Sequence, residues 1–168
     1  MEEKIQSAML PHIRTHKGYV PGEQPDTTGW VKLNTNENPY PPSPAVKDAI
    51  LVETDGLRLY SSPDGRELRE AIARRHDVSA DRILLGNGSD DVLNVLARAF
   101  SDANNPIATI APAYSLYPVL ASLQNAEVRT LEFGRDFSLP ASDIARCGAG
   151  IFFLTSPNAP TRTGYSND

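Results

Sequence analysis

The chain has 168 residues, of which 40% are hydrophobic and 22% are charged, and its 16 Lys and Arg against 21 Asp and Glu give a net charge of -5. This composition is typical of a globular protein with one sizeable core. The acidic balance, without a block of basic residues, excludes the electrostatic footprint of a nucleic-acid-binding protein. No stretch approaches the ~20 apolar residues of a spanning helix, and residues 1–20 lack the apolar run of a secretory signal, so we expect no membrane partner and a cytoplasmic location.

The cysteine and histidine content argues against a disulfide and against a metal site. Cys147 is the single cysteine, and the three histidines His12, His16 and His76 do not have the spacing of metal ligands. Cys147 lies in the small-residue stretch ARCGAG, without a neighbouring base, and we interpret it as a structural residue.

Proline divides the chain, because eight of the 14 prolines lie within residues 1–63. We therefore expect an N-terminal arm over residues 1–63, with a helix at 44–52 and a short strand at 31–33. Residues 60–66 are typical of a turn, in which Asp64 is placed to cap a helix that ends near Arg75.

The pattern changes from residue 82 onward to short apolar strands alternating with helices. Helix 89–100 carries the clearest apolar stripe. Such alternation indicates βαβ units, so we expect an α/β fold, a three-layer α/β/α arrangement with a mainly parallel sheet. The expected strands are 83–85, 107–110, 127–131 and 151–154, and the expected helices are 89–100, 115–124 and 141–146.

A glycine-rich turn, GNGSDD at residues 86–91, joins the first of these strands to its helix. Backbone N–H groups at such a helix start favour an anion such as a phosphate. The turn lacks the third glycine of a dinucleotide fingerprint, where Asp91 stands, and the lysine of a P-loop. The alternative is that Ser89 caps the helix, Asp90 and Asp91 complement its dipole, and Gly88 merely turns the chain.

Two further loops follow strands and offer an aromatic ring and an amide. Tyr114 could stack on a planar ring or simply pack at a helix entrance, and Asn158 lies in a loop whose two prolines fix the backbone. Because the carboxyl ends of parallel strands share one edge, we expect the anion site, Tyr114 and Asn158 to surround one cavity. A phosphorylated aromatic cofactor would fit this set.

Six stretches in collinear order carry a resemblance to a known family. The chain resembles the N-terminal part of histidinol-phosphate aminotransferases, fold type I enzymes that use pyridoxal 5'-phosphate (PLP). The stretches are PHIRTHKGYVPGEQP at 11–25, KLNTNENPYPPSP at 32–44, LYSSPDGRELREAIA at 59–73, LLGNGSDDVL at 84–93, PAYSLYPV at 112–119 and SPNAPT at 156–161. The resemblance implies an N-terminal arm and small-domain segment over residues 1–63 and an incomplete PLP-binding large domain over residues 64–168.

The resemblance also implies roles for the residues of the three loops. The backbone at Gly88, Ser89 and Asp90 would hold the PLP phosphate, Tyr114 would stack on the pyridine ring, and Asn158 would hydrogen-bond the 3-hydroxyl. One departure concerns the last loop, where the family usually has a glycine directly after the Pro-Thr pair and this chain has Arg162.

Three residues outside these loops match other positions of the family. Tyr60 matches a tyrosine that reaches the cofactor phosphate of the neighbouring subunit, which implies a homodimer; its alternative is a half-buried tyrosine in a turn. Tyr19 and Asn36 match the substrate pocket, although Asn36 could equally satisfy local backbone groups in an Asn-rich turn.

The activity implied by the resemblance is amino transfer between glutamate and imidazole-acetol phosphate in histidine biosynthesis. The lysine that forms the Schiff base with PLP lies further on in the family than residue 168, so we expect no catalytic residue in these 168 residues and no activity from them alone. Alternatives are another fold type I enzyme, an aromatic aminotransferase or threonine-phosphate decarboxylase, and a non-catalytic phosphate-binding or interaction remnant.

Overall fold

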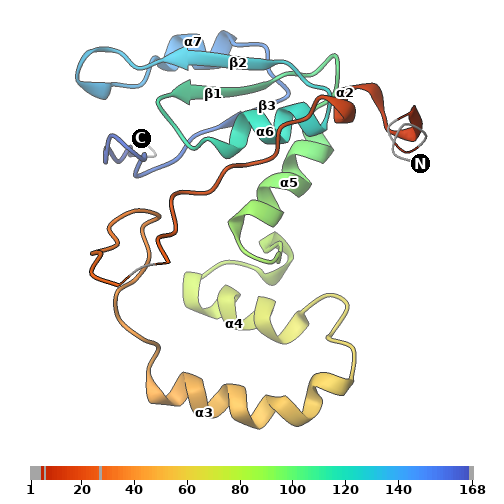
Figure 1. Cartoon of the computed structure of the whole chain (residues 1–168), viewed down its shortest axis with the longest axis vertical. Coiled ribbons are helices and arrows are strands. Elements are labelled where there is room, and N and C mark those ends of the chain that lie inside the picture. The colour runs from red at the N-terminus through yellow and green to blue at the C-terminus, as the bar shows by residue number, and fades with distance from the viewer. Residues whose placement is uncertain (1–4, 6, 27, 167–168) are drawn as a thin grey trace. The chain divides into compact units, whose positions relative to one another are not determined.

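The structure is a computed structural model that describes residues 5, 7–26 and 28–166 (Figure 1). It divides the chain into two compact units. The first unit joins Met1–Tyr19 to Gly86–Asp168, and the second is Val20–Leu85. The first unit is therefore assembled from both ends of the chain, whereas the domain boundary expected at residue 63 stays a prediction.

A parallel sheet forms the centre of the first unit. Strand β1 (Ile107–Ala111) pairs with β2 (Val128–Glu132) on one side and with β3 (Ile151–Phe153) on the other, in the order β2-β1-β3. Ile107 lies opposite both Val128 and Ile151, which sets the register. The expected strands at 107–110, 127–131 and 151–154 are thereby confirmed, each to within a residue or so at its ends.

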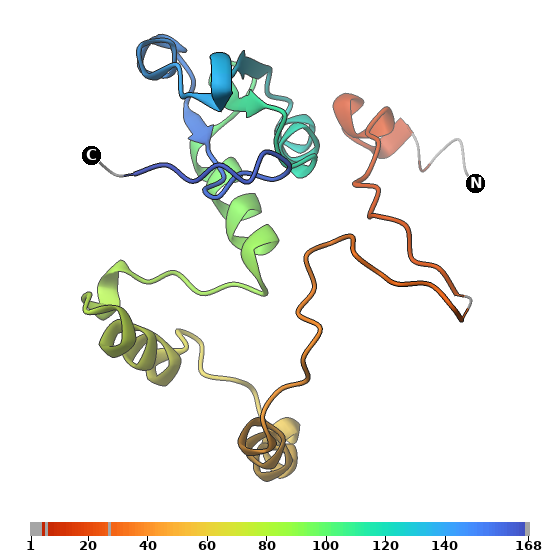
Figure 2. The ribbon, with the colours of Figure 1, turned by 90° about the vertical axis from the view of Figure 1, so that its left-hand side faces the viewer.

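Helices cover both faces of this sheet. Helix α6 (Leu116–Leu123) connects β1 to β2, and α7 (Ala141–Arg146), which follows the short helix η3 (Arg135–Phe137), connects β2 to β3. The two connecting helices lie on opposite sides of the sheet (Figures 1 and 2), because right-handed crossovers that run in opposite directions along a sheet must use opposite faces. The sheet and its two helical layers confirm the expected α/β class.

The core of the first unit lies where α5 (Ser89–Phe100) and α6 pack together and onto β1. Ala97 and Ala121 are fully buried, and their small side chains let the two helices approach closely. Strand β1 is buried along most of its length because it is the central strand. The buried core cluster consists of Ala97, Ile107, Leu116, Tyr117, Leu120, Ala121 and Phe153.

The N-terminal segment of the first unit contains a short helix that the sequence patterns did not indicate, α2 (Pro11–Arg14). Pro11 occupies its first position, where the missing N–H costs no hydrogen bond. Helix α2 packs against α6, and the side chains of His16 and Ser122 hydrogen-bond each other across this contact.

The described residues of the second unit form two α-helices and two short 3-10 helices. They are α3 (Pro44–Glu53), η1 (Thr54–Arg58), α4 (Arg66–His76) and η2 (Ala80–Arg82). Helix α3 confirms the helix expected at 44–52, although none of its residues is buried within the described chain. Arg69 fixes α4 to η2, since its Nη2 and Nε atoms donate to the carbonyl oxygen of Ala80 at 2.7 and 3.0 Å.

Two expected strands are wrong. Residues 31–33 and 83–85 form no strand, and both lie in irregular backbone. A strand exists only when a neighbour takes up its hydrogen bonds, and the only sheet in the described residues is the three-stranded one of the first unit. The local sequence pattern alone therefore predicted two strands that do not form.

The expected helix caps at Asp64 and Ser89 also need correction. Helix α4 begins after Gly65, which takes the N-cap position at φ 55°, while Asp64 lies one residue earlier and accepts from the N–H of Arg66 at 3.3 Å. Helix α5 begins after Gly88, with Ser89 already inside the helix. In both cases a glycine supplies a backbone conformation with positive φ that a capping Ser or Asp rarely adopts.

Candidate functional site

Three loops meet at the carboxyl edge of the sheet in the first unit. They are the start of α5, the segment after β1 and the segment after β3. The hydroxyl of Tyr114 donates to the carboxylate of Asp90, at 3.1 Å to Oδ2 and 3.3 Å to Oδ1. The amide Nδ2 of Asn158 donates to the carbonyl oxygen of Pro112 at 2.9 Å. Each loop is thus joined to the next by a hydrogen bond.

The start of α5 is shaped by Gly86 and Gly88. Gly88 has φ 82° and ψ 178°, a conformation open to glycine and hardly to other residues. A Cβ atom on Gly86 would lie 2.8 Å from Cγ2 of Val92, too close for any side chain. The carboxylate of Asp91 accepts from the N–H of Asn87 at 3.0 Å, and no side chain of the described residues caps the helix. The first N–H groups of α5 therefore form a cradle suited to an anion.

Tyr114 is surrounded by aromatic rings and by one carboxylate. Its ring makes edge-on contacts with Tyr19, at 5.9 Å between ring centres, and with Tyr117, at 5.8 Å. Tyr117 in turn stacks on Phe153 at 5.0 Å and shares a hydrogen bond of 2.7 Å with the hydroxyl of Thr155. Burial raises the pKa of Tyr114, and the neighbouring Tyr19 and Asp90 raise that pKa further. The phenol is therefore a proton donor across the neutral range.

Asn158 is the buried polar residue of the site, with 2% of its surface exposed. Its Nδ2 donates to Pro112 and, at 3.2 Å, to the hydroxyl of Thr161. Its Oδ1 is buried and has no hydrogen-bond partner among the described residues. An unpaired buried acceptor costs about 1–3 kcal/mol, so this oxygen is suited to a ligand that brings a hydroxyl donor.

The loop around Asn158 closes on itself through its backbone. The N–H of Asn158 donates to the carbonyl of Thr163 at 2.8 Å, and the N–H of Arg162 donates to the carbonyl of Asn158 at 2.6 Å. Arg162 has φ 61°, in the left-handed region that favours glycine. The turn after Pro160 and Thr161 is thus made by an arginine in a backbone conformation that favours glycine.

Six of the eight residues expected at the site belong to the first unit. They are Tyr19, Gly88, Ser89, Asp90, Tyr114 and Asn158. Asn36 and Tyr60 belong to the second unit. Asn36 lies in a turn at φ 52°, and Tyr60 is fully exposed, so the half-buried alternative for Tyr60 is wrong.

Three residues with no role predicted from the sequence also contact the residues of these loops: Tyr117, Thr155 and Thr161. Tyr117 follows Tyr114 by three residues, a spacing that brings both rings to the same side as α6 begins. This spacing was a usable signal. Thr155 and Thr161 flank Asn158, but their hydrogen bonds depend on the path of the loop, which the sequence pattern does not define.

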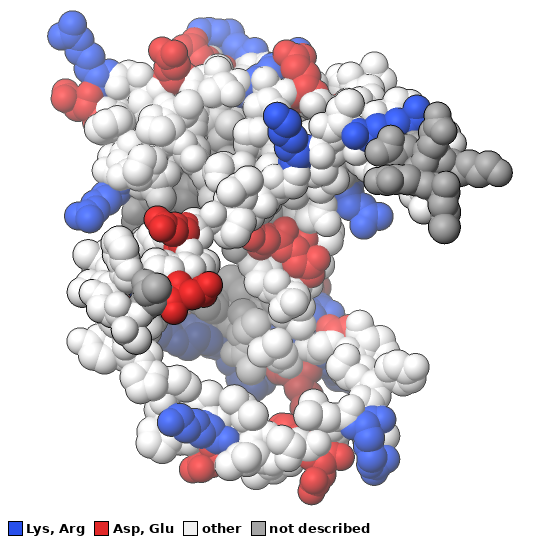
Figure 3. Space-filling model, in the orientation of Figure 1, with Lys and Arg blue, Asp and Glu red and all other residues white. Residues whose placement is uncertain are grey.

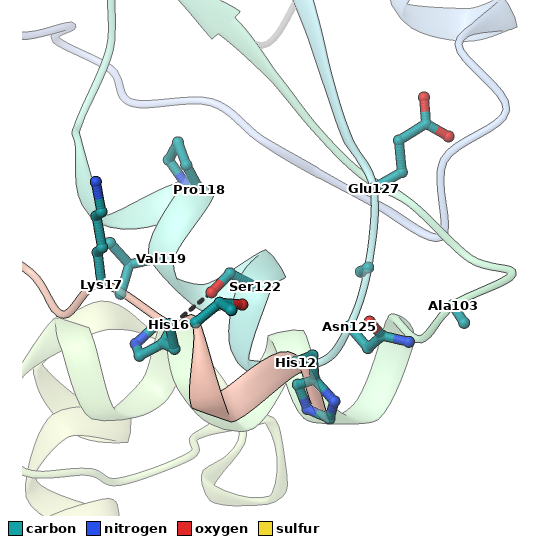
Figure 4. Close-up of a pocket in the computed structure, with 11 residues that line it drawn as sticks. His12, His16, Lys17, Ala103, Pro118, Val119, Ser122, Asn125 and Glu127 are labelled. Carbon is teal, nitrogen blue, oxygen red and sulfur yellow. Dashed lines mark hydrogen bonds between the residues drawn. The ribbon is translucent and has the colours of Figure 1, made fainter. Parts of the chain in front are cut away.

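A cavity of about 710 Å³, shown in Figure 4, is lined by none of the residues of these loops named above. It is lined by residues of α2, of the carboxyl end of α6 and of the segment leading into β2, among them His12, His16, Ser122 and Asn125. It therefore lies toward the amino ends of the strands. In the described part of the chain no three His, Cys, Asp or Glu side chains gather to hold a metal. His16 is already hydrogen-bonded to Ser122. We therefore interpret this cavity as a space at the packing contact between α2 and α6, not as a binding site.

The charged side chains do not separate by sign on the face shown in Figure 3. Lys and Arg side chains there are interspersed with Asp and Glu.

None of the helices in the described residues has the length and apolar character needed to cross a bilayer.

Comparison with known sequences identifies relatives along nearly the whole chain. The family model for class I and II aminotransferases matches residues 28–168. The histidinol-phosphate aminotransferase of Geotalea uraniireducens (strain Rf4) is 48% identical over 165 residues, which cover 95% of this chain and 47% of that protein. The histidinol-phosphate aminotransferase of Synechocystis sp. is 42% identical over 153 residues, covering 91% of this chain and 44% of that protein. The chain thus spans about half the length of the curated relatives it matches.

Comparison with solved structures identifies the same fold. The histidinol-phosphate aminotransferase of Sinorhizobium meliloti, solved in complex with pyridoxal-5'-phosphate, superposes with a TM-score of 0.69 at 24% identity, covering 75% of this chain and 35% of that one. A putative histidinol-phosphate aminotransferase from Erwinia carotovora atroseptica gives a TM-score of 0.71 at 22% identity, covering 80% of this chain and 40% of that one. The described architecture is therefore part of a fold type I aminotransferase fold.

Proposed function

This chain belongs to the family of class I and II aminotransferases, and we propose that it forms the PLP-binding N-terminal part of an enzyme that transfers an amino group between glutamate and imidazole-acetol phosphate. The observation that carries the proposal is the joining of Asp90, Tyr114 and Asn158 at one edge of the sheet. The relatives named histidinol-phosphate aminotransferase support the substrate pair. We also propose a cytoplasmic location, which is usual for a biosynthetic reaction of this kind.

The residues at the carboxyl edge fit a phosphorylated pyridine. Backbone N–H groups at Gly88, Ser89 and Asp90 would hold the phosphate at the positive end of the α5 dipole. The ring of Tyr114 would lie against the pyridine, and Oδ1 of Asn158, which lacks a partner in the described chain, would accept from the 3-hydroxyl. When bound, PLP supplies an electron-withdrawing ring that stabilises negative charge on the substrate carbon.

The protein groups would orient the cofactor and control protons around it. Asn158 is held by Pro112 and Thr161, so its free oxygen is fixed at one point and would keep a hydroxyl proton there. Tyr114 would keep its own proton, because burial raises its pKa. The Tyr19 ring beside Tyr114 would shield this side of the site from water.

Three assignments extend the proposal beyond the carboxyl edge. Tyr19 and Asn36 would contact the substrate, and Tyr60 would reach the cofactor phosphate of a second subunit. The full exposure of Tyr60 leaves its hydroxyl available for such a contact. The protein would accordingly act as a homodimer.

Cofactor binding tests the proposal most directly. The chain is titrated with PLP and with pyridoxal, which lacks the phosphate, and binding is followed by cofactor absorbance and by tyrosine fluorescence. We expect saturable binding of PLP and at least tenfold weaker binding of pyridoxal, because the α5 cradle contributes only to the phosphate, and each tenfold step is about 1.4 kcal/mol. Equal affinity for the two compounds, or no binding of either, would contradict the proposal.

The DNA that follows codon 168 tests the assignment to an aminotransferase over a non-catalytic remnant. A reading frame that continues into a lysine segment of the SKxxxxxG kind would support the enzyme. A stop codon followed by unrelated sequence would favour the remnant. Transamination assays on the protein encoded by the continued frame, with imidazole-acetol phosphate and with aromatic keto acids as acceptors, then distinguish the substrate classes.

A further inference from the structure

We propose that the side chain of Asp90 is a positioning residue that holds the ring of Tyr114 in place for the cofactor. The proposal rests on the proposed function, since it concerns the PLP site, but it assigns to the Asp90 carboxylate a role separate from that of the Asp90 backbone. The observation is the hydrogen bond from the Tyr114 hydroxyl to both carboxylate oxygens, at 3.1 and 3.3 Å.

The contact joins two elements that are 24 residues apart in sequence. Asp90 lies in the first turn of α5, and Tyr114 lies in the loop between β1 and α6. The rings of Tyr19 and Tyr117 pack edge-on against the Tyr114 ring. These aromatic contacts limit the tilt of the ring, and the hydrogen bond fixes its hydroxyl end. Together they hold the ring plane that a cofactor would stack on.

A carboxylate at this point has a cost that the hydrogen bond offsets. The phosphate of PLP would be negatively charged, and Asp90 adds a second negative charge in the same helix turn. Asp91 already supplies an acidic side chain to this turn, and its carboxylate accepts from the N–H of Asn87. Asp90 is therefore not needed to close the turn. The Asp90 carboxylate accepts from the hydroxyl of Tyr114, and a charged acceptor makes the stronger hydrogen bond.

The role separates into two parts that different substitutions test. Asp90→Asn keeps an acceptor oxygen for the Tyr114 hydroxyl and removes the charge, whereas Asp90→Ala removes both. Tyr114→Phe keeps the ring and removes the hydroxyl. If Asp90 acts through Tyr114, then Asp90→Ala loses its effect once the hydroxyl is absent.

The experiment is a double-mutant cycle on the 168-residue chain with PLP affinity as the readout. We expect Asp90→Ala to weaken PLP binding about tenfold, as for the loss of one hydrogen bond to a charged group. Asp90→Asn should bind within about threefold of wild type. The double variant Asp90→Ala/Tyr114→Phe should bind no more weakly than Tyr114→Phe alone. Asp143→Ala, which removes an exposed carboxylate from the first turn of α7, is the matched control and should bind like wild type.

An alkaline titration gives a second readout that does not depend on PLP. Among the six tyrosines, Tyr114 should ionise late, and Asp90→Ala should move its ionisation to lower pH. Tyr19→Phe, which removes the other neighbouring hydroxyl, measures the separate contribution of Tyr19. Thermal unfolding of every variant shows that the fold is intact.

The outcomes separate this proposal from the proposed function. If wild type does not bind PLP, the proposed function fails, and the titration still decides whether Asp90 holds Tyr114. If wild type binds PLP but Asp90→Ala binds equally well, or weakens binding as much in the Tyr114→Phe background as in wild type, the positioning role is overturned. A late-ionising tyrosine that Asp90→Ala leaves unchanged would overturn it as well.

Discussion

At the scale of single residues, the loop after β3 combines a buried amide with a backbone position that is unfavourable for its side chain. Asn158 is held by two backbone hydrogen bonds, to Thr163 and from Arg162. The second of these needs Arg162 in the left-handed region. The geometry that presents Asn158 therefore depends on a residue whose Cβ atom destabilises that conformation.

Replacing Arg162 with glycine should stabilise the protein. Arg162→Gly removes the left-handed strain of about 1–2 kcal/mol and adds some flexibility to the unfolded chain, so we expect a net gain of about 1 kcal/mol in the free energy of unfolding. Arg162→Ala keeps the Cβ atom and should give no gain. Urea unfolding of the three proteins measures the difference. A loss of stability in Arg162→Gly would mean that the arginine side chain itself stabilises the loop.

Asp102 is the residue at which we expect a dependence on pH. It accepts hydrogen bonds from the N–H of Asn104 and from the backbone and side chain of Asn105, in the turn between α5 and β1. These bonds lower the pKa of Asp102 from its ordinary value of 3.8. A carboxyl group with a lowered folded-state pKa stabilises the fold above its unfolded pKa, and this contribution is lost as the pH falls through the folded pKa.

The stability difference between wild type and Asp102→Ala should therefore be present at pH 7 and shrink as the pH falls below 3.8. Denaturant unfolding at a series of pH values measures it. Asp55→Ala, at an exposed position where the described residues form no such hydrogen bonds with the carboxylate, serves as control. A difference that stays constant down to the acid limit would contradict the assigned cause.

At the scale of elements, sequence patterns predicted the buried helices and strands of the first unit. They did not predict which segments find a neighbouring strand to pair with. The apolar run at 107–110 became β1 because it is covered on both sides, and the stripe along 89–100 became α5. The segments VKL at 31–33 and ILL at 83–85 have no hydrogen-bonded neighbour in the described sheet. Strand pairing joins distant segments, so a local pattern cannot establish it.

The same distinction applies to the candidate site. The positions of Tyr114 and Asn158 after strands could be predicted, because parallel strands end at a common edge. The hydrogen bond between Tyr114 and Asp90, and the unpaired oxygen of Asn158, could not, since they depend on side-chain rotamers in loops. The position of Gly88 as the N-cap could not be predicted either, because serine is in general preferred at N-caps and Ser89 is the next residue.

Gly88 and Gly164 form a matched pair for testing the start of α5. A Cβ atom on either glycine would meet no atom within 4 Å, but only Gly88 has a positive φ, of 82°. We expect Gly88→Ala to lower the free energy of unfolding by about 1–3 kcal/mol and Gly164→Ala to change it little. Thermal unfolding compares the two. Equal effects would show that backbone conformation is not what requires glycine at position 88.

At the scale of the whole molecule, the positions of the four lysines bear on the chemistry of the proposed cofactor site. The lysines are Lys4, Lys17, Lys32 and Lys47, all near the N-terminus. Lys17 lines the cavity toward the amino ends of the strands, and Lys32 forms an ion pair with Glu37 at 2.5 Å. None matches the lysine segment of the family that the chain resembles.

Borohydride reduction of the chain with PLP should therefore yield no stoichiometric label at a single lysine. Scattered partial labelling is expected from exposed amines. Peptide mapping after digestion measures the distribution, and free lysine added in excess should suppress the scattered label. One fully modified lysine would contradict the prediction that these 168 residues bind PLP without forming a Schiff base.

The first unit is formed by two separate stretches of the chain. These stretches are synthesised at different times, which limits the order in which the unit can fold during translation. Helix α2 and the following His16 leave the ribosome early. Ser122 of α6, which hydrogen-bonds His16, comes 106 residues later, and all of Val20–Leu85 is synthesised in between. The N-terminal segment therefore cannot make its contact with α6 until α6 has left the ribosome. Closing so long a loop carries a large entropic cost, so α2 should be added late to a first unit already nucleated by α5, β1 and α6.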